Sequence, residues 1–511
     1  MSDHARRLIG IEAINKSGER WTGKDELVAV VDSGIDSTHP DLDDRIDSFE
    51  AVEGAMDTDR VGHGTHVSGT IAGSGRASTG KIRGMAPEAR LVGLGIVGES
   101  GRLCLPVDLG ELLHKVAEKG AKIINLSWGA PVSSAYENGS MAVDTFAREQ
   151  PDVLVIVAAG NQGRALRGYP ALYSIGTPAT AKNVLTVGAC ASDRRNFDTT
   201  WGSYREARFP AAPTNEQRLA GNPKLPAALS SRGPTDADAV KPDVLAPGTA
   251  ILAPRAAKAP ASSFWKELAR YDNRYGYMNG TSMATPVVSG AAAVLRQYLR
   301  EEQELKSPSS ALLRAALIAS VKRIPWSRDP ASEAQCGYPD FDQGFGRIDL
   351  GRLIPHAASP KGHALGLVDV QAEGADALEA RAPEGAPHKA IHSYAFKVPN
   401  GAGELRIVLA WTDYSARSVQ NLLKLDVRGP EGWRWRGNEK HCWLQPPEAD
   451  LDPETLDMRW DQRNNVQAVA VEKPPAGEYH VRVTAQNTLF PPQGFALCAS
   501  GQLEGGLTRE S

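Results

Sequence analysis

Short runs of apolar residues alternate with longer stretches of helical periodicity from the start of the chain to about residue 351. This alternation predicts an α/β fold, in which helices cover both faces of a parallel β-sheet. A helix is expected over residues 107–119, because apolar residues recur at helical spacing up to Val116 and Gly120 then ends the pattern. The runs that have the length of buried strands are 27–31, 90–94, 122–126, 153–159 and 183–187.

The pattern changes beyond about residue 355, where apolar and polar residues alternate one by one. Such alternation is typical of strands with one buried face, and Tyr394, Phe396 and Val398 are an example. We therefore expect two domains. The first is an α/β domain over residues 1–355, and the second is an antiparallel β-sandwich over residues 356–511.

Composition and charge narrow the classes of function. The chain has 57 lysines and arginines against 61 aspartates and glutamates, so its net charge of -4 provides no basic surface for nucleic acid or an anionic membrane. No apolar run approaches the roughly 18 residues that a membrane helix needs. Residues 1–15 lack the apolar stretch of a secretory signal. We therefore expect a cytoplasmic protein if the chain is complete as written, and a secreted mature form without its signal and prodomain is the alternative.

The five cysteines of the chain are odd in number and far apart. Neither a disulfide scaffold nor a zinc site built from a CxxC pair is expected from such spacing. The sequence leaves two interpretations open. Either the cysteines are isolated thiols that pack as small apolar residues, or one bridge joins Cys442 to Cys498.

Three segments place a reactive side chain directly after an apolar run or at the start of a helical pattern. Asp32 follows the first strand run, His63 lies within Gly-His-Gly-Thr-His, and Ser282 precedes small residues that predict a helix. A serine becomes a nucleophile at neutral pH when a histidine, oriented by a buried carboxylate, takes its proton. The N–H group of Ser282, at the start of a helix, can also stabilise an oxyanion. These three residues are therefore the candidate catalytic residues.

The same segments resemble those of the subtilisin family of serine proteases, whose triad follows the order Asp, His, Ser along the chain. The resemblance extends to Asn-Leu-Ser-Trp-Gly at 125–129, to Ala-Ala-Gly-Asn at 158–161 and to Lys-Pro-Asp-Val-Leu-Ala-Pro-Gly at 241–248. It implies a subtilisin-like sheet and an endopeptidase that hydrolyses proteins and peptides through an acyl-enzyme intermediate. It also implies that Asn161 donates its side-chain amide to the oxyanion.

The resemblance implies a substrate site as well. Two extended segments, 98–102 and 127–129, would hold the substrate peptide as a strand between them, so that its backbone is recognised more than its sequence. The residues assigned to substrate binding are Gly98, Ser100, Gly101, Ser127, Trp128, Gly129, Ala159 and Gly160.

A looser similarity connects the chain to large bacterial alkaline subtilases with a C-terminal jelly-roll domain. The Ser-Trp-Gly variant at 127–129, the segment Ser-Ser-Arg-Gly-Pro at 230–234 and the β-rich C-terminal part carry this similarity. Relatives usually have a prodomain, but only 31 residues precede Asp32. We therefore expect that neither a prodomain nor an inhibitor is encoded in this chain.

The chemistry of a serine protease requires no cofactor, and the only metal question concerns structural calcium. Residues 76–81, Arg-Ala-Ser-Thr-Gly-Lys, depart from the asparagine-rich loop that binds calcium in shorter subtilisins. Because a cationic loop repels the ion, we expect that this site is missing. Metal ligands stay unknown, and the carboxylates left open as calcium ligands are Asp413, Asp426 and Asp461.

Two other functions remain as alternatives. The first is a catalytically latent subtilase scaffold that acts as a binding protein. The second is a metal-dependent hydrolase, which would gather acidic and histidine side chains near the N-terminus but lacks an HExxH motif. The side chains that it would use are those of Asp32, Asp36, His39, Asp41, His63 and His66.

Overall fold

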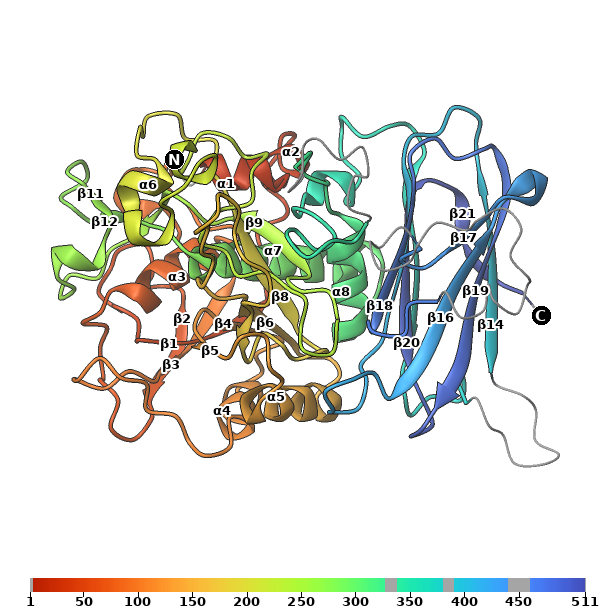
Figure 1. The fold of residues 1–511 in the computed structure, drawn as a ribbon, viewed down its shortest axis with the longest axis horizontal. Helices are drawn as coiled ribbons and strands as arrows, with labels where there is room; N and C mark the ends of the chain where they lie inside the picture. Colours follow the sequence, from red (N-terminus) through yellow and green to blue (C-terminus); the bar gives the residue numbers. More distant parts are fainter. Residues whose placement is uncertain (1–2, 327–337, 380–389, 440–459, 511) are drawn as a thin grey trace.

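The computed structural model describes residues 3–326, 338–379, 390–439 and 460–510 (Figure 1). Its centre is a seven-stranded sheet in which every neighbouring pair of strands is parallel, with the order β2-β3-β1-β4-β6-β8-β9. The predicted α/β class is confirmed. The strands are β1 (Leu27–Asp32), β2 (Ile46–Ala51), β3 (Arg90–Gly95), β4 (Ile123–Leu126), β6 (Leu154–Ala158), β8 (Leu185–Cys190) and β9 (Val244–Pro247).

Helices cover both faces of this sheet, because successive side chains of a buried strand point to opposite sides. Val28 and Val30 of β1 belong to one hydrophobic core, whereas Ala29 and Val31 belong to the other. The first core includes residues of α3 (His63–Ala72), α7 (Thr281–Glu302) and α8 (Ser310–Ala319), and the second includes residues of α4 (Gly110–Ala117) and α5 (Asn138–Glu149). The helix expected over 107–119 is α4 and is shorter at both ends.

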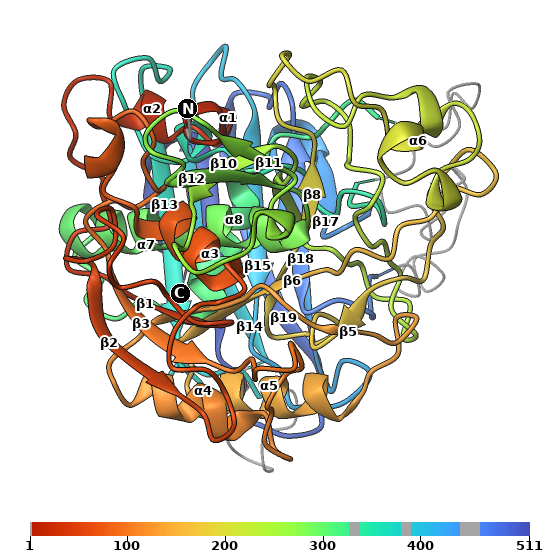
Figure 2. The ribbon, with the colours of Figure 1, turned by 90° about the vertical axis from the view of Figure 1, so that its left-hand side faces the viewer.

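Smaller elements surround the sheet. A three-stranded sheet lies beside α3, and Figure 2 shows both at the end of the molecule that is opposite to the C-terminal region. The smaller strands are β5 (Ala130–Pro131), β7 (Gly176–Thr177), β10 (Ile251–Pro254), β11 (Lys266–Leu268) and β12 (Tyr275–Met278). The short helices are α1 (Asp3–Leu8), α2 (Ile11–Ile14) and α6 (Trp201–Tyr204), and the 3₁₀ turns are Arg76–Ser78, Glu206–Arg208, Thr214–Glu216, Ala261–Ser263, Leu350–Arg352 and Pro430–Gly432.

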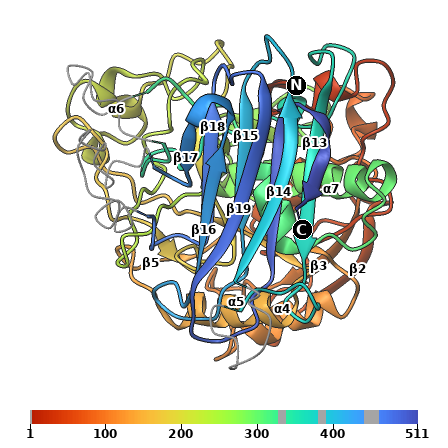
Figure 3. The ribbon, with the colours of Figure 1, turned by 90° about the vertical axis from the view of Figure 1, so that its right-hand side faces the viewer.

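Two antiparallel sheets form the C-terminal region, as the alternating pattern predicts, and Figure 3 views them from their outer side. A shared core, with Ile407, Leu425 and Val481, lies between them. The four-stranded sheet has the order β13 (His363–Val370), β20 (Phe495–Gln502), β15 (Leu405–Ala410), β18 (Val466–Val471). The five-stranded sheet has the order β17 (Arg434–Arg436), β16 (Asn421–Arg428), β19 (Gly477–Thr488), β14 (Ile391–Val398), β21 (Glu504–Arg509).

The two central strands of the four-stranded sheet, β20 and β15, are buried on both faces, which the alternating pattern does not predict. Ile407 and Leu409 of β15 point into the core between the two sheets, whereas Val408 and Ala410 belong to the core around α7 and α8. The strand therefore packs against α8 as well as against the second antiparallel sheet. The α/β part and the C-terminal part are joined by apolar packing over this face.

A buried ion pair reinforces the junction. The Nζ group of Lys182 lies 2.8 Å from a carboxylate oxygen of Asp413 and also donates to the carbonyl oxygens of Tyr414 and Ser418. Arg314 of α8 is fully buried and donates to the carbonyl oxygen of Trp411 over 2.7 Å.

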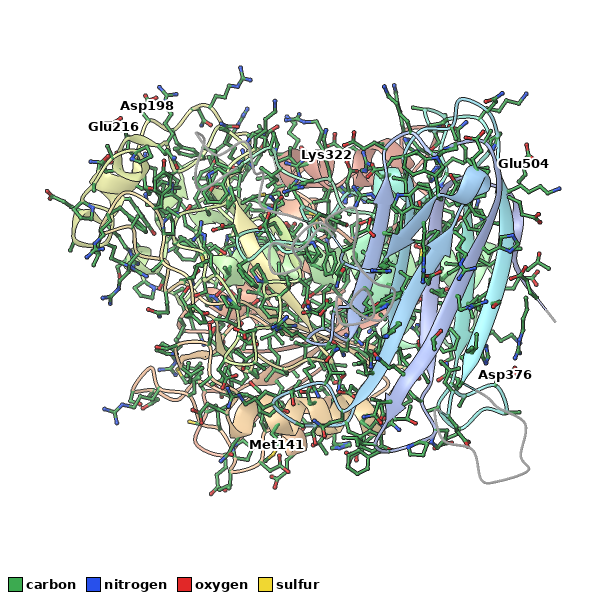
Figure 4. All side chains as sticks on the ribbon, turned by 45° about the vertical axis from the view of Figure 1, so that its right-hand side comes forward. Met141, Asp198, Glu216, Lys322, Asp376 and Glu504 are labelled. Atoms are coloured by element: carbon green, nitrogen blue, oxygen red, sulfur yellow. The ribbon has the colours of Figure 1, made fainter. Side chains whose placement is uncertain are left out.

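Charged side chains at the surface lie at both ends of the molecule. Asp198 and Glu216 are at one end, and Asp376 and Glu504 are at the other (Figure 4).

Two further predictions concern the cysteines and the membrane. Cys498 is buried and is a free thiol, and its candidate partner Cys442 lies outside the described residues. Cys104 and Cys190 are free thiols as well. Within the described ranges, no helix is long and apolar enough to cross a membrane.

Candidate active site

Asp32 and His63 come from two elements that meet at the carboxyl edge of the central sheet. Asp32 is the last residue of β1, the position where ligand-binding groups gather in open parallel sheets. His63 is the first residue of α3, and Gly62 before it has a φ of 86°, a left-handed conformation that glycine adopts without strain. The Nδ1 atom of His63 lies 2.7 Å from Oδ1 of the buried Asp32. This hydrogen bond fixes the plane of the imidazole ring.

The electrostatic surroundings of His63 favour its protonated form. Burial of the ring lowers its pKa, but the charge of Asp32, the hydrogen bond to Asp32 and the charge of Asp59 together outweigh burial, so the pKa is raised. The side chain keeps 28% of its surface exposed. The ring can therefore reach a group in the adjoining pocket, and its protonated form is stabilised when it takes a proton.

Ser282 is the second residue of α7 and is less buried than the residues on either side of it. Asn161 is held beside it, because Oδ1 of Asn161 accepts a hydrogen bond of 2.8 Å from the N–H group of Thr281. This contact orients the amide so that its Nδ2 group is available for another acceptor. A Cβ atom on Gly280 would lie 3.3 Å from Nδ2 of Asn161, so the glycine permits the close approach.

A pocket of about 420 Å³ brings these residues together. All four predicted catalytic residues line it. Of the eight residues assigned to substrate binding, five also line it, namely Gly101, Ser127, Trp128, Gly129 and Gly160.

The other three assigned residues lie outside the lining of this pocket. Ala159 is fully buried in the core beneath it, and Gly98 is buried beside Cys104. Ser100 is exposed at the tip of the turn that links 98 to 102. Their contacts with a substrate stay a prediction.

Several apolar residues that the sequence does not single out also line the pocket. Leu103, with 42% of its surface exposed, pairs as an isolated bridge with Val97 and forms part of the wall together with Ile96 and Val61. Ile96 and Leu103 stand on either side of the segment 98–102 in the sequence, but this position does not show which side chains turn inward. The pocket therefore has an apolar wall next to its reactive residues.

Two of the groups that a metal-dependent hydrolase would use, His66 and Asp36, form hydrogen bonds with the backbone of the fold. His66 is fully buried, and its Nε2 lies 3.2 Å from each of the carbonyl oxygens of Ile251 and Gly276. Burial and the charge of His63 lower the pKa of His66 to about 3, so the ring stays neutral. Asp36 accepts from the N–H group of Ala257. The described residues contain no group of three or more His, Cys, Asp or Glu side chains that could hold a metal ion.

The carboxylates left open as calcium ligands have donors of the protein as partners. Asp413 pairs with Lys182, Arg434 donates to Asp426 over 2.6 Å, and Asn438 donates to Asp461 over 2.6 Å. In the loop 76–81, the guanidinium of Arg76 pairs with Asp43. Each of these side chains therefore has a hydrogen-bond or ion-pair partner within the protein.

A larger cavity of about 690 Å³ lies at the junction with the C-terminal region. It is lined by Arg148 and Glu149 of α5 and by Tyr414 and Gln493 of the C-terminal region, and none of the predicted catalytic residues lines it. The smaller pocket is therefore the candidate active site, although the cavity at the junction is larger.

Comparisons with known proteins identify a family and several similar proteins. A family model described as the subtilase family matches residues 23–346. Serine protease AprX of Bacillus subtilis is 32% identical over 58% of this chain and 61% of its own length. Subtilisin BL of Lederbergia lenta is 33% identical over 54% of this chain and 78% of its own length. The chain covers only 22% to 30% of the length of several longer curated relatives. Among solved structures, Sphericase is 25% identical with a TM-score of 0.46, over 67% of this chain and 97% of that chain.

Proposed function

Because the chain belongs to the subtilase family, we propose that it is a serine endopeptidase that hydrolyses peptide bonds of proteins and peptides. The observation that carries this proposal is the hydrogen bond of 2.7 Å between His63 and Asp32, in a pocket that Ser282 and Asn161 also line. These side chains are those that acyl transfer requires: a nucleophile, a base, a group that orients the base, and a donor for the oxyanion.

The proposed reaction has two steps. His63 takes the proton of the Ser282 hydroxyl as its Oγ attacks the carbonyl carbon of the scissile bond, and Asp32 stabilises the resulting imidazolium. Nδ2 of Asn161 and the N–H group of Ser282 donate to the tetrahedral oxyanion. His63 then gives its proton to the leaving amine, which departs and leaves an acyl-enzyme. Water, activated by His63, hydrolyses the ester and restores the hydroxyl of Ser282.

The substrate is proposed to bind as an extended strand between the segments 98–102 and 127–129. Trp128 supports the second segment, because its Nε1 group donates to the carbonyl oxygen of Val31 over 2.8 Å. This bond attaches the segment to the residue that precedes Asp32. Backbone hydrogen bonds would then set the position of the scissile carbonyl relative to Ser282.

We also propose that residues 1–355 and 356–511 are two domains. The family match ends at residue 346, and the antiparallel sheets begin with β13 at His363. The buried pairing between Lys182 and Asp413 supports the view that the second domain stabilises the first. A role of this domain in guiding protein substrates is part of the same proposal.

The test is labelling with a fluorophosphonate probe, read by intact mass and by hydrolysis of a peptide substrate. We expect a single adduct on Ser282. In Ser282→Ala, the adduct should be absent and the turnover should fall by at least about 10³-fold. Ser17→Ala, which removes an exposed serine hydroxyl that does not line the pocket, is the control and should react like the unaltered chain.

Three results would contradict the proposal. Peptidase activity retained by Ser282→Ala would exclude this serine as the nucleophile. Activity that a chelator abolishes and the probe does not affect would favour the metal-dependent hydrolase. A folded chain that forms no adduct would favour the latent scaffold that acts as a binding protein.

A further inference from the structure

Asp59 is a buried carboxylate that lies four residues before His63, and the mechanism above assigns it no role. Only 1% of its surface is exposed. Oδ1 accepts hydrogen bonds from the hydroxyl of Ser33 over 2.9 Å and from the N–H groups of Val61 and Gly62 over 3.1 Å and 2.7 Å. Oδ2 accepts from the N–H group and the hydroxyl of Thr65, over 2.8 Å and 2.6 Å. One side chain thus accepts hydrogen bonds from Ser33, from the loop before α3 and from the first turn of α3.

Part of this arrangement is helix capping. Gly62 occupies the N-cap position of α3 and has no side chain that could accept from the first N–H groups of the helix. Asp59 accepts from the N–H group of Thr65, the third residue of the helix, and supplies a negative charge at the positive end of the helix dipole. The first turn of α3, which carries His63, is therefore held by Asp59 rather than by its own cap.

The other part connects α3 to the end of β1. Ser33 follows Asp32 in the chain, and its hydroxyl donates to Asp59 while it accepts a hydrogen bond of 2.9 Å from the N–H group of Gly64. Asp59 is thus bonded to the neighbour of Asp32, and Ser33 is bonded to the neighbour of His63. The backbone is tightly packed here, because a Cβ atom on Gly34 would lie 3.1 Å from the N atom of Asp59.

From this geometry we propose that Asp59 is a positioning residue that fixes the Asp32–His63 pair and stabilises the imidazolium of His63 by its charge. The proposal rests on the proposed function, because it concerns the base of that reaction. Asp59 acts through Ser33, through the first turn of α3 and through its field, without touching the reacting atoms.

The charged and titratable groups around His63 show how this role can be measured. Asp32 faces it from β1, Asp59 from the loop before α3, and His66 from the next turn of the same helix. Burial lowers the pKa of His63, and the charges of Asp32 and Asp59 raise it. His66 contributes no charge at the pH of activity, because its own pKa is about 3. Removal of the charge of Asp59 therefore lowers the pKa of His63.

The sign of the pH effect follows from the role of the base. Peptide hydrolysis needs neutral His63, so the rate falls on the acid side as His63 becomes protonated. A lower pKa keeps the ring neutral to a more acidic pH. We expect the acid limb of kcat/KM to move to lower pH in Asp59→Asn, together with a loss of kcat of about 10- to 100-fold from misplacement of the base.

Two further variants separate position from charge. Ser33→Ala removes the hydrogen bond that Ser33 donates to Asp59 and the one that it accepts from Gly64, but leaves the charge of Asp59 in place, so kcat should fall with no movement of the acid limb. Asp57→Asn removes one negative charge from an exposed position two residues away, and kcat and the acid limb should match those of the unaltered chain. KM should stay within about threefold in Asp59→Asn and Asp57→Asn, because neither side chain lines the pocket. Ser33 does line the pocket, so its variant is judged by kcat and the acid limb alone.

The experiment combines pH profiles on a neutral peptide substrate with fluorophosphonate labelling, thermal unfolding and an NMR titration of the His63 ring. A folded Asp59→Asn with unaltered kcat and an unmoved acid limb would overturn the proposal. So would a loss of activity that only matches its unfolded fraction. If Asp59→Asn does not fold, an unaltered kcat in Ser33→Ala overturns the positioning role.

The NMR titration keeps this proposal separate from the proposed function. If the unaltered chain is folded but inert toward the probe and the substrate, the proposed function fails. A lower pKa of the His63 ring in folded Asp59→Asn than in the unaltered chain would then still support the electrostatic role. An equal pKa in the two proteins would refute that role.

Discussion

Two groups of buried charged side chains, one at the candidate active site and one at the junction with the C-terminal region, differ in how fully they are satisfied. At the active site, Oδ1 of Asp32 is bonded to His63 and to the N–H group of Ser33. Its other oxygen, Oδ2, is buried and has no hydrogen-bond partner in the part of the chain that the structure describes.

The junction is arranged differently. Asp413 is fully buried, and its carboxylate accepts from Lys182 and from the N–H groups of Gln420 and Asn421. Lys182 in turn uses its ammonium group for Asp413 and for the carbonyl oxygens of Tyr414 and Ser418. Both charges at the junction are surrounded by fixed partners.

The difference separates a structural network from a reactive one. When one partner of a buried charge is removed, the free energy of unfolding falls, so the junction network stabilises one geometry. The active-site pair instead includes a ring that is partly exposed and must change its protonation state during the proposed reaction. Substitutions in the first group should therefore affect turnover, and substitutions in the second should affect folding.

The largest effect is expected for Asp32→Asn. The amide cannot hold His63 in the orientation and tautomer that the base needs, and kcat should fall by about 10⁴-fold, the order of magnitude that this error costs in serine proteases. The midpoint of urea unfolding should change little, because the carboxylate already lacks a partner for one oxygen. Steady-state hydrolysis and urea unfolding of the same preparation measure both quantities.

An Asp32→Asn protein that keeps most of its kcat would remove Asp32 from the proposed mechanism. A large drop in the unfolding midpoint at normal kcat per folded molecule would reverse the comparison, because the pair would then be structural.

The second prediction concerns Lys182→Met at the junction. Methionine fills a similar volume but leaves Asp413 as a buried charge without its cation, so the free energy of unfolding should fall by about 3–5 kcal/mol. Turnover per folded molecule on a short peptide should stay unchanged, because Lys182 does not line the active-site pocket. Urea unfolding and active-site titration with the fluorophosphonate probe give the two values.

The matched control is an exposed ion pair. Arg218 lies 3.1 Å from Asp198, and both side chains are largely exposed. Arg218→Gln should change the free energy of unfolding by less than about 1 kcal/mol. If Lys182→Met costs no more than this control, the junction pair does not stabilise the fold.

The sequence predicts the elements that carry the catalytic residues better than the contacts that hold these elements in place. The run 27–31 and the observed strand Leu27–Asp32 agree, because a strand buried on both faces is a continuous apolar run. The segment around His63 and the helix that begins beside Ser282 were likewise recognisable, since each combines a reactive residue with glycine or small residues. The pocket that joins them depends on the sheet order, which local patterns do not contain.

The contacts that hold these elements in place join distant parts of the chain. Lys182 and Asp413 are 231 residues apart, and no local pattern pairs them. The alternation over 405–411 predicts one buried face, but Val408 is buried as well, because α8 packs on the side that the pattern assigns to solvent. The sequence does not indicate the contact between Asp59 and Ser33 either, since an aspartate before a helix usually accepts only from the first N–H groups of that helix.

The smallest effect is expected for a series of contacts that leads from the C-terminal region to the wall of the pocket. Arg417 of the C-terminal region pairs with Asp236, and the N–H group of Asp236 donates to the carbonyl oxygen of Ser134. The hydroxyl of Ser134 accepts from the N–H group of Ile175, beside the strand pair β5 and β7. Residues of that pair line the pocket, so a junction loop contacts the wall of the active site through Ser134.

Ser134→Ala tests this connection. It leaves the buried N–H group of Ile175 without its acceptor, which should cost about 1–3 kcal/mol of unfolding free energy. Because the affected strands form the wall and carry no reacting group, KM should rise a few-fold while kcat stays within about twofold. Thr145→Ala, which removes an exposed hydroxyl from α5, should change the unfolding free energy by less than about 0.5 kcal/mol and leave KM unaltered. A fall in kcat at constant KM would mean that the junction acts on the catalytic residues themselves, and the separation of structural from reactive charges would no longer hold.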